Sequence, residues 1–297
     1  MMIMAGHRAA VQRASSYYLP SGRFAGLSDG LDFFRFCTEA LADFENRKEE
    51  LMQGLADVSR EVFVRNGLMI SLTCEESAGE QLKKALSAFA ASLPEDDTVR
   101  FAVPQPEKKN EGIMTTGAVG FVASCGSFKA AGPYTGALKV LNTVLSTDYL
   151  WQQLRVLGGA YGAMSSFTMQ GPSYFASYRD PNIRSTKEAY ENIPAYLEAL
   201  DLPQEILDSF IISTIGSLDF PFTPSVQGKR DFGAWLCGIT PEMQQKERDE
   251  VLGCSSADLK KLAAYVREIL KDNNFCTFGS AVAIEKDKDL FDRTENL

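Results

Sequence analysis

A turn rich in glycine, within residues 151–163, constrains the fold of this chain more than any other segment. Its sequence, WQQLRVLGGAYGA, places three glycines within five residues around Tyr161. Glycine adopts left-handed backbone angles and permits close approaches that a side chain would block. The pattern predicts a helix that ends abruptly and continues directly into a strand, with Arg155 and Tyr161 presented from the two sides of one tight turn.

The same residues also have a purely structural interpretation. Helices commonly end in glycine, and an arginine in the last turn interacts favourably with the partial negative charge at the helix C-terminus. Tyr161 would then be a packed aromatic residue. On local pattern alone, both interpretations of Arg155 and Tyr161 stay open.

Length and charge narrow the classes of function. A chain of 297 residues exceeds one typical domain, so two domains of unequal size are expected. The net charge of −9 repels phosphate backbones, which predicts no nucleic-acid partner. No run of apolar residues approaches the length of a membrane span, so no membrane partner is expected either.

The histidine and cysteine content limits the chemistry. His7 is the single histidine, which excludes a metal site that needs two imidazoles, and it has no nucleophile elbow near it. We therefore expect no metal or cofactor in this chain, and His7 to be a surface or packing residue. The six cysteines are far apart, without a C-x-x-C pair, as expected for buried, reduced thiols of an intracellular protein.

Helical periodicity dominates the first hundred residues. Residues 7–27 lack a clear period and contain Pro20 and two glycines, so they are predicted to be irregular or strand-like. The segment 94–112 is rich in proline and charge, which is typical of a linker, and it predicts a domain boundary near residue 100. Between them the pattern predicts helices over 31–44, 45–63 and 77–93, and a strand over 67–74.

The remainder alternates strands with helices and returns to a strand. Such an order, with the sheet first, helices next and a last strand that rejoins the sheet, predicts an α+β fold. The sequence predicts strands over 112–128, 160–170, 172–181 and 275–284, and helices over 133–154, 186–200, 203–218, 224–236, 241–252 and 255–270.

Several strings in this second part resemble one known family in order and spacing. They resemble the C-terminal half of the pitrilysin, or insulinase, class of zinc metalloendopeptidases, in its presequence protease and falcilysin branch. The strings are EGIMTTGAVGFVA, LSTDYLWQQLRVLGGAYGA, SYRDPN, IISTIGSLDFPFTPSVQGK and GITPEMQQKERDEVLG.

The resemblance implies two α/β-layer domains, each an antiparallel-rich sheet packed with helices. Residues 1–99 would be the incomplete end of the family's third domain, and residues 100–297 its fourth domain. Enzymes of this family consist of two halves that close around an unfolded peptide. The family's zinc, its ligands and its glutamate base belong to the N-terminal half, so the resemblance implies zinc there and none in this chain.

In this family the C-terminal half contributes an arginine and a tyrosine from the glycine turn, and the matching positions are Arg155 and Tyr161. A tyrosine hydroxyl can stabilise the negative charge that develops on a peptide carbonyl under attack, and a guanidinium can hold a carbonyl or carboxylate. The expected partners are the N-terminal zinc-binding half of the same protease and unstructured peptides. Alone, the chain is expected to be inactive.

A second function stays open: a catalytically inactive scaffold or partner subunit of the same superfamily, which binds another protein. The expected location is intracellular, either cytoplasmic or in an organellar matrix of the mitochondrial type.

Weaker candidates lie in the strands that follow the glycine turn. For Arg179 and Asp180, an internal ion pair that holds the end of a strand is favoured over contact with a substrate. For Tyr174, Phe175 and Tyr178, a place in the core or on the sheet face is favoured over a platform for a peptide. The strand that begins at Ala160 offers an edge for a bound peptide only if that edge is open, which the sequence does not decide.

Overall fold

The computed structural model describes residues 5–96 and 102–297. They form two compact units. The first contains the residues up to 34 together with 103–219 and 244–297, and the second contains 35–102 and 220–243. The predicted domain boundary near residue 100 lies outside the described residues.

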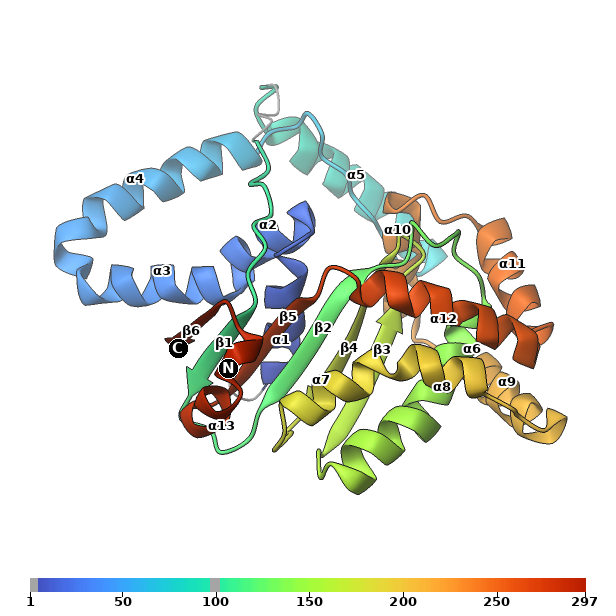
Figure 1. Cartoon of the computed structure of the whole chain (residues 1–297). Coiled ribbons are helices and arrows are strands. Elements are labelled where there is room, and N and C mark those ends of the chain that lie inside the picture. The colour runs from blue at the N-terminus through green and yellow to red at the C-terminus, as the bar shows by residue number, and fades with distance from the viewer. Residues whose placement is uncertain (1–4, 97–101) are drawn as a thin grey trace. The chain divides into compact units, whose positions relative to one another are not determined.

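A mixed sheet of six strands forms the centre of the first unit, in the order β3-β4-β2-β5-β1-β6 (Figure 1). The pairs β3–β4, β4–β2 and β2–β5 are antiparallel, whereas β5–β1 and β1–β6 are parallel. This sheet with its helices confirms the α+β class. The strands are β1 Glu111–Thr115, β2 Phe121–Ser127, β3 Gly162–Phe167, β4 Pro172–Tyr178, β5 Asn274–Ser280 and β6 Arg293–Asn296.

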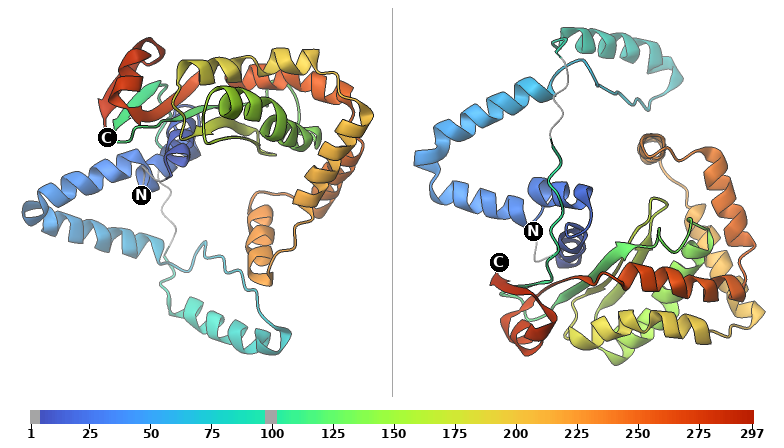
Figure 2. Two further views of the ribbon diagram at one scale, coloured as in Figure 1. Left: turned by 90° about the horizontal axis from the view of Figure 1, so that it is seen from below. Right: turned by 45° about the horizontal axis from the view of Figure 1, so that its top comes forward.

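Helices cover both faces of this sheet (Figures 1 and 2). Helix α12 (Ser256–Leu270) and the pair α7 (Arg184–Glu191) and α8 (Ile193–Ala199) lie on one face, and α1 (Gly6–Ser15) lies on the other. The remaining helices that lie wholly in this unit are α2 Pro20–Asp29, α6 Ala137–Val144, η1 Leu145–Tyr149, η2 Trp151–Leu157, α9 Gln204–Leu218, α13 Ala281–Lys286 and η3 Lys288–Leu290. Helices α3 (Leu31–Ala42) and α11 (Pro241–Leu252) cross between the two units.

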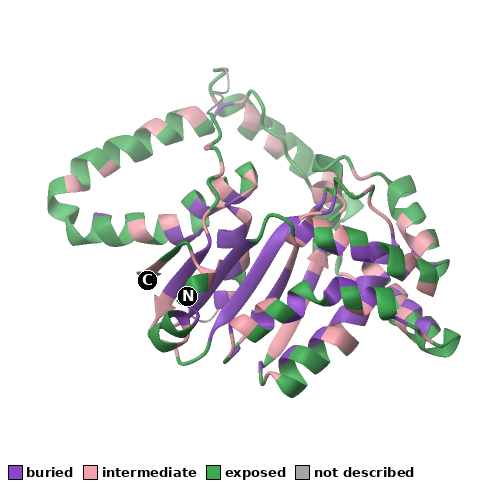
Figure 3. Cartoon of the chain, in the orientation of Figure 1, coloured by how far each residue is buried: buried purple, intermediate pink, exposed green. Residues whose placement is uncertain are grey.

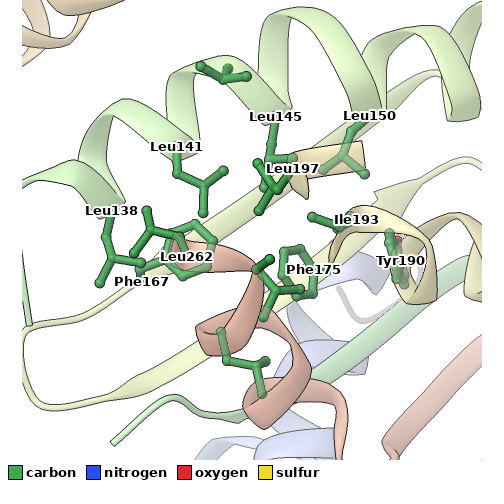
Figure 4. Packing of buried hydrophobic residues seen from close by; sticks show 14 of the residues in the cluster. Leu138, Leu141, Leu145, Leu150, Phe167, Phe175, Tyr190, Ile193, Leu197 and Leu262 are labelled. Atoms are coloured by element: carbon green, nitrogen blue, oxygen red, sulfur yellow. The ribbon is translucent and has the colours of Figure 1, made fainter. Parts of the chain in front are cut away.

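The alternation of side chains along the strands produces two separate cores, because successive residues of a strand point to opposite faces. In β4, Phe175 belongs to the larger core, together with leucines of α6 and η1 (Figure 4). Its neighbour Ala176 belongs to the smaller core. In β5, Phe275 and Cys276 divide in the same way. Ala10 on α1 is fully buried in the smaller core.

The prediction that residues 7–27 are irregular or strand-like is wrong, because they form α1 and α2. Pro20 occupies the first turn of α2, where its missing N–H has no cost. Gly22 allows the two helices to pack closely, since a Cβ there would lie 2.6 Å from the Ser15 carbonyl oxygen. Pro20 therefore begins a helix, and Gly22 permits two helices to pack closely, although together they suggested a loop.

A buried ionic cluster joins α1 to the sheet. Both Arg13 and Glu111 are buried, and Glu111 has no exposed surface. The Arg13 guanidinium donates to both carboxylate oxygens of Glu111, with Nη2 at 2.9 Å from Oε1, and the Tyr17 hydroxyl donates to Oε2 at 2.8 Å. Nη1 of Arg13 also contacts both oxygens of Asp32 at 3.1 Å, and Arg23 completes the cluster by pairing with Asp32.

Two further predictions near the C-terminus need correction. The strand expected over 275–284 ends at Ser280, because the Ser280 hydroxyl accepts the N–H of Ala283 and caps α13. The polar residues near the C-terminus, for which no strand was predicted, contain β6. Its sequence RTEN lacks the apolar alternation of a half-buried strand, because β6 lies at the edge of the sheet. At the start of α12, Ser255 and Asp258 form a reciprocal capping box.

The second unit contains α4 (Phe44–Val62), α5 (Glu76–Ser92), α10 (Pro224–Leu236) and the end of α3, which confirms its predicted helices. The strand predicted over 67–74 is wrong: residues 68–75 pair with no strand in the described ranges. An isolated extended segment has no partner for its backbone groups, so its β-type sequence alone does not make a strand.

Apolar residues lie at the surface of this second unit. Four of them follow one another at helical spacing on α4, which Figure 3 shows to be largely exposed. Their exposed fractions are 70% for Met52, 72% for Leu55, 57% for Val58 and 62% for Val62. We call these four residues the α4 stripe.

The six cysteines are free thiols, but only half are buried. Burial raises the pKa of the Cys125 thiol to about 12, and Cys254 and Cys276 are buried as well. The prediction of buried thiols is wrong for the three exposed cysteines of the second unit, Cys37, Cys74 and Cys237. Across the described ranges, no helix combines the length and the apolar composition that a membrane crossing requires.

We expect Glu111→Gln to lower the free energy of unfolding by about 3 kcal/mol, because it removes one partner of a buried ion pair and leaves Arg13 with Asp32 alone. Urea unfolding at neutral pH measures the change. Glu285→Gln is the matched control: Glu285 pairs with Lys288 in the open, at 51% and 63% exposure, so its loss should cost less than about 1 kcal/mol. Equal costs for the two variants would contradict a stabilising role for the cluster.

The same pair predicts a dependence of stability on pH. Burial alone would raise the pKa of Glu111, but the hydrogen bond and charge of Arg13, with the Tyr17 hydroxyl, outweigh it and lower the pKa below the usual 4.5. A carboxyl with a lowered pKa stabilises the fold above its ordinary pKa, and this contribution is lost as the pH falls below 4.5. Melting temperatures from pH 6 downward should therefore fall more steeply for the unaltered chain than for Glu111→Gln. Parallel curves would contradict the assignment.

Candidate functional site

The glycine turn has the geometry that the sequence predicts. Arg155 lies in the last turn of η2, and Tyr161 directly precedes β3. The N–H of Gly159 donates to the Arg155 carbonyl at 3.1 Å, and the N–H of Ala160 donates to the Leu154 carbonyl at 2.8 Å, which closes the end of the helix.

The two adjacent glycines in this turn serve different purposes. Gly159 has a φ of +76°, a left-handed conformation that glycine adopts without strain. A Cβ on Gly158 would lie 2.7 Å from the Leu154 carbonyl oxygen, so that position is closed to side chains. Both glycines are therefore needed for the chain to reverse between Arg155 and Tyr161.

The helix that leads into the turn is wider than an α-helix. After α6, residues 145–149 and 151–157 form π-helical turns, which are rare and frequently occur at functional sites. Leu150 and Leu154 are buried in the larger core (Figure 4 labels Leu150), whereas Trp151 and Arg155 face outward. The inner leucines thereby anchor the segment that presents Arg155.

Arg155 and Tyr161 come together at the surface. The Cζ atom of Arg155 lies 4.2 Å from the ring centroid of Trp151 and 5.5 Å from that of Tyr161, within the range of cation–π attraction. Trp151 is 41% exposed and Tyr161 is 63% exposed. Both predicted residues therefore occupy one accessible cluster, while their role in catalysis stays a prediction.

The aromatic cluster continues onto β4 and α1. The Tyr178 ring meets the edge of Tyr161 at a centroid distance of 5.8 Å, and it packs against His7 at 5.1 Å and Phe121 at 5.5 Å. Tyr178 is thus both a sheet-face aromatic, as predicted, and the neighbour of Tyr161. Of the other two strand aromatics, Phe175 is fully buried in the larger core, and Tyr174 is half-buried on the opposite face.

The predicted ion pair between Arg179 and Asp180 is not formed. Asp180 is buried and accepts hydrogen bonds from the Thr186 hydroxyl at 2.7 Å and the Asn182 N–H at 2.9 Å. Burial raises the pKa of Asp180, and these hydrogen bonds only partly oppose the rise. The Arg179 side chain is exposed, with its Cζ 5.5 Å from the Tyr178 ring centroid.

The loop SYRDPN supports the glycine turn from the other side. The Asn182 side chain donates to the Gly158 carbonyl at 2.6 Å, and the backbones of Asp180 and Gly120 exchange two hydrogen bonds. These contacts hold the end of β4 beside the start of β3. They explain why two distant strings of the sequence contribute to one site.

Two neighbours of the site were not assigned a functional role from the sequence. Trp151 precedes Arg155 by four residues on a helix, a spacing that places two side chains on one face, so the sequence contained a usable signal. Tyr178 has no such local signal, because its place beside Tyr161 depends on the pairing of β3 with β4. The sheet order shows that β3 is one of the two outermost strands, so one of its edges pairs with no other strand in the described ranges.

The residues that the structure describes do not fit a zinc site. Within residues 5–96 and 102–297, no three histidine, cysteine, aspartate or glutamate side chains gather where they could hold a metal. The single histidine, His7, packs edge-on against Tyr178 instead.

Comparisons with known proteins agree with the fold and the motifs. Residues 110–284, which include β1–β5 and the glycine turn, match the family described as PreP C-terminal domain. Protein HypA of Clostridium perfringens is 33% identical over 294 residues, covering 98% of this chain and 30% of the relative. Presequence protease 1, chloroplastic/mitochondrial, of Arabidopsis thaliana is 28% identical over 289 residues, covering 96% of this chain and 26% of the relative.

This chain therefore spans less than a third of the length of these two relatives. Among solved structures, the peptidase M16 inactive domain from Pseudomonas fluorescens has a TM-score of 0.50 at 17% identity, covering 69% of this chain and 52% of that one, which shows a likeness of fold. Because the family match extends over more than half of the chain, the protein belongs to the presequence protease family and contains its PreP C-terminal domain.

Proposed function

We propose that this chain is the non-zinc, C-terminal half of a zinc metalloendopeptidase that degrades short, unstructured peptides inside a closed chamber. The observation that carries the proposal is the accessible pair Arg155 and Tyr161, held by the glycine turn. In the finer form of the proposal, residues 1–99 are the incomplete third domain of the family and residues 100–297 its fourth, each with α/β layers.

The free donors of both side chains suit a peptide substrate. The Arg155 Cζ lies over the Trp151 ring, a contact that involves no N–H hydrogen bond and leaves the guanidinium donors available for a substrate. No carboxylate in the described ranges pairs with it. The Tyr161 hydroxyl is a donor that can stabilise the negative charge developing on a carbonyl oxygen, and Arg155 can hold a neighbouring carbonyl or carboxylate.

Zinc, in this proposal, belongs to the N-terminal half, where it supplies the activated water that attacks the peptide. Among the described residues of this chain, the possible ligands do not fit the metal. Arg155 and Tyr161 therefore bind and orient the peptide and stabilise charge, and they complete a site whose metal another segment holds.

The partners follow from the same proposal. The α4 stripe is an exposed apolar surface of the kind that a further part of the protease would cover. The names of the plant and animal relatives place those proteins in mitochondria or chloroplasts. We propose an intracellular location for this chain, either cytoplasmic or in an organellar matrix.

A second candidate is an inactive scaffold or partner subunit. It is favoured by the same α4 stripe, and by the likeness of fold to a solved structure that is described as an inactive domain. The two candidates differ in what Arg155 and Tyr161 do: a scaffold requires neither side chain.

Mixing the chain with the zinc-binding half of the same protease should restore cleavage of an unstructured, quenched-fluorescence peptide, whereas the chain alone should be inactive. A zinc chelator should abolish the restored activity. Stable association without cleavage would support the scaffold and contradict the protease proposal.

In the reconstituted enzyme, Tyr161→Phe should lower kcat by roughly 10²–10³-fold, the usual effect of losing one donor to a developing oxyanion. Arg155→Ala should lower kcat/KM by about 10–100-fold, because it removes charge-assisted hydrogen bonds. Steady-state kinetics measure both effects, with circular dichroism melts as a check of folding. The control is Tyr265→Phe on α12, whose hydroxyl binds the Pro133 carbonyl. Turnover unchanged in both site variants would remove the assignment.

A further inference from the structure

We propose that Arg179 is a second substrate-binding arginine, which holds a carboxylate of an extended peptide laid across Tyr161 and Tyr178, while Arg155 binds the same peptide beside Tyr161. The inference rests on the proposed function, because it names the class of peptide that this site prefers. The carboxylate is either an acidic side chain or the C-terminus of the peptide.

Each of the four side chains contacts the next, and we call this series of contacts the row. Arg155 Cζ lies 5.5 Å from the Tyr161 ring centroid, that ring lies 5.8 Å from the Tyr178 ring, and the latter lies 5.5 Å from Arg179 Cζ. Side chains on one face of an extended peptide repeat every two residues, about 6.6 Å apart. The steps of the row are close to this repeat, so a peptide in extended conformation can contact successive members of the row.

Both guanidinium groups keep their donors free. Most arginines of the first unit face carboxylates, as Arg13, Arg184 and Arg248 do. In the described part of the chain, neither Arg155 nor Arg179 has a carboxylate within ion-pair distance, and each lies over an aromatic ring instead. Stacking occupies the face of a guanidinium and leaves its in-plane fork of N–H groups, which matches a carboxylate.

Arg179 also has an unfavourable backbone conformation. Its φ is +50°, in the left-handed region where residues other than glycine are strained. This conformation lets the Arg179 carbonyl accept the Tyr161 N–H at 3.3 Å, beside the Tyr178 carbonyl at 3.0 Å. Glycine would provide the same backbone without strain, so the arginine side chain is not explained by the stability of this turn. Strain of this kind with an exposed, unpaired side chain points to a role in binding.

Tyr178, the inner ring of the platform between the two arginines, is packed on two sides. Tyr178 is held from the side of α1 by His7 and from within the sheet by Phe121. Burial, together with the charge of Arg8, lowers the pKa of His7, so its imidazole is neutral at pH 7 and adds no charge to the platform. A surface ordered before binding loses little entropy when a peptide binds, which strengthens the interaction.

The test uses the whole chain and four fluorescein-labelled, flexible peptides of one length, measured by fluorescence anisotropy. The peptides combine one central Glu or Gln with a free or an amidated C-terminus. Arg179→Gly should weaken binding of the carboxylate-bearing peptides by about tenfold, the effect of losing one charge-assisted hydrogen bond. It should not change binding of the Gln, amidated peptide. If the loss of affinity occurs only with the Glu peptides, Arg179 holds an acidic side chain. If it occurs only with the peptides that have a free C-terminus, Arg179 holds the C-terminal carboxylate.

Thermal melts separate binding from folding. Arg179→Gly relieves the strained φ, so its melting temperature should be equal to or above that of the unaltered chain. Arg179→Asn, which also tolerates a left-handed backbone, should show the same loss of binding. The matched control is Arg230→Ala: this exposed guanidinium lies 4.1 Å from the Phe222 ring centroid, in the second unit, and its loss should not change peptide affinity.

The outcomes distinguish this inference from the proposed function. If Arg155→Ala weakens peptide binding while Arg179→Gly binds as the unaltered chain does, the inference is wrong and the proposed function stands. A loss of binding that accompanies an equal loss of thermal stability would assign Arg179 a structural role and also overturn the inference. If the unaltered chain binds none of the four peptides, both are contradicted.

Discussion

The buried pair of Arg13 and Glu111 is the interaction on which the candidate site depends. It joins residues that are 98 positions apart in the chain and fastens α1 to the face of the sheet. His7, on the same helix, packs against Tyr178, and Tyr178 supports Tyr161. A charged pair this deeply buried is unfavourable to separate, because either group alone would remain desolvated without a partner. The pair therefore keeps α1 against the strands that carry the aromatic platform.

The site is built from the ends of secondary structure elements. A π-helical segment ends at the glycine turn, β3 begins there, and β4 returns beside it into the SYRDPN loop. Each end leaves backbone groups without regular partners, and here they satisfy one another: the Tyr161 N–H binds the end of β4, and Asn182 binds the Gly158 carbonyl. Rigid elements on three sides hold these ends in place. Because the backbone at these ends is held in place, Arg155 and Tyr161 can keep a defined position while their side chains stay accessible.

The charge of the whole chain and the charge of the site have opposite signs. The net charge of −9 predicts the absence of phosphate-binding partners and is spread over the molecule. Arg155 and Arg179, by contrast, belong to one series of side chains in contact, and in the described ranges neither has a carboxylate within ion-pair distance. The composition of a chain averages over its surface, so a local excess of one sign is visible only when the fold places particular side chains together. The carboxylate preference that we propose for this site therefore depends on the tertiary structure.

The sequence by itself determined the α+β class, most of the helices, the existence of the strands β3 and β4, and the position of Arg155 and Tyr161 on the two sides of one turn. These features depend on periodicity, turn glycines and helix caps, which act over a few neighbouring residues. Only the tertiary structure decided that residues 6–29 form helices, that RTEN joins the sheet as β6 and that residues 68–75 form no strand. It also decided that Arg179 lies over Tyr178 and not against Asp180. Each of these depends on contacts between segments far apart in the chain, and local patterns contain no information on which distant surface is available to pair or to pack.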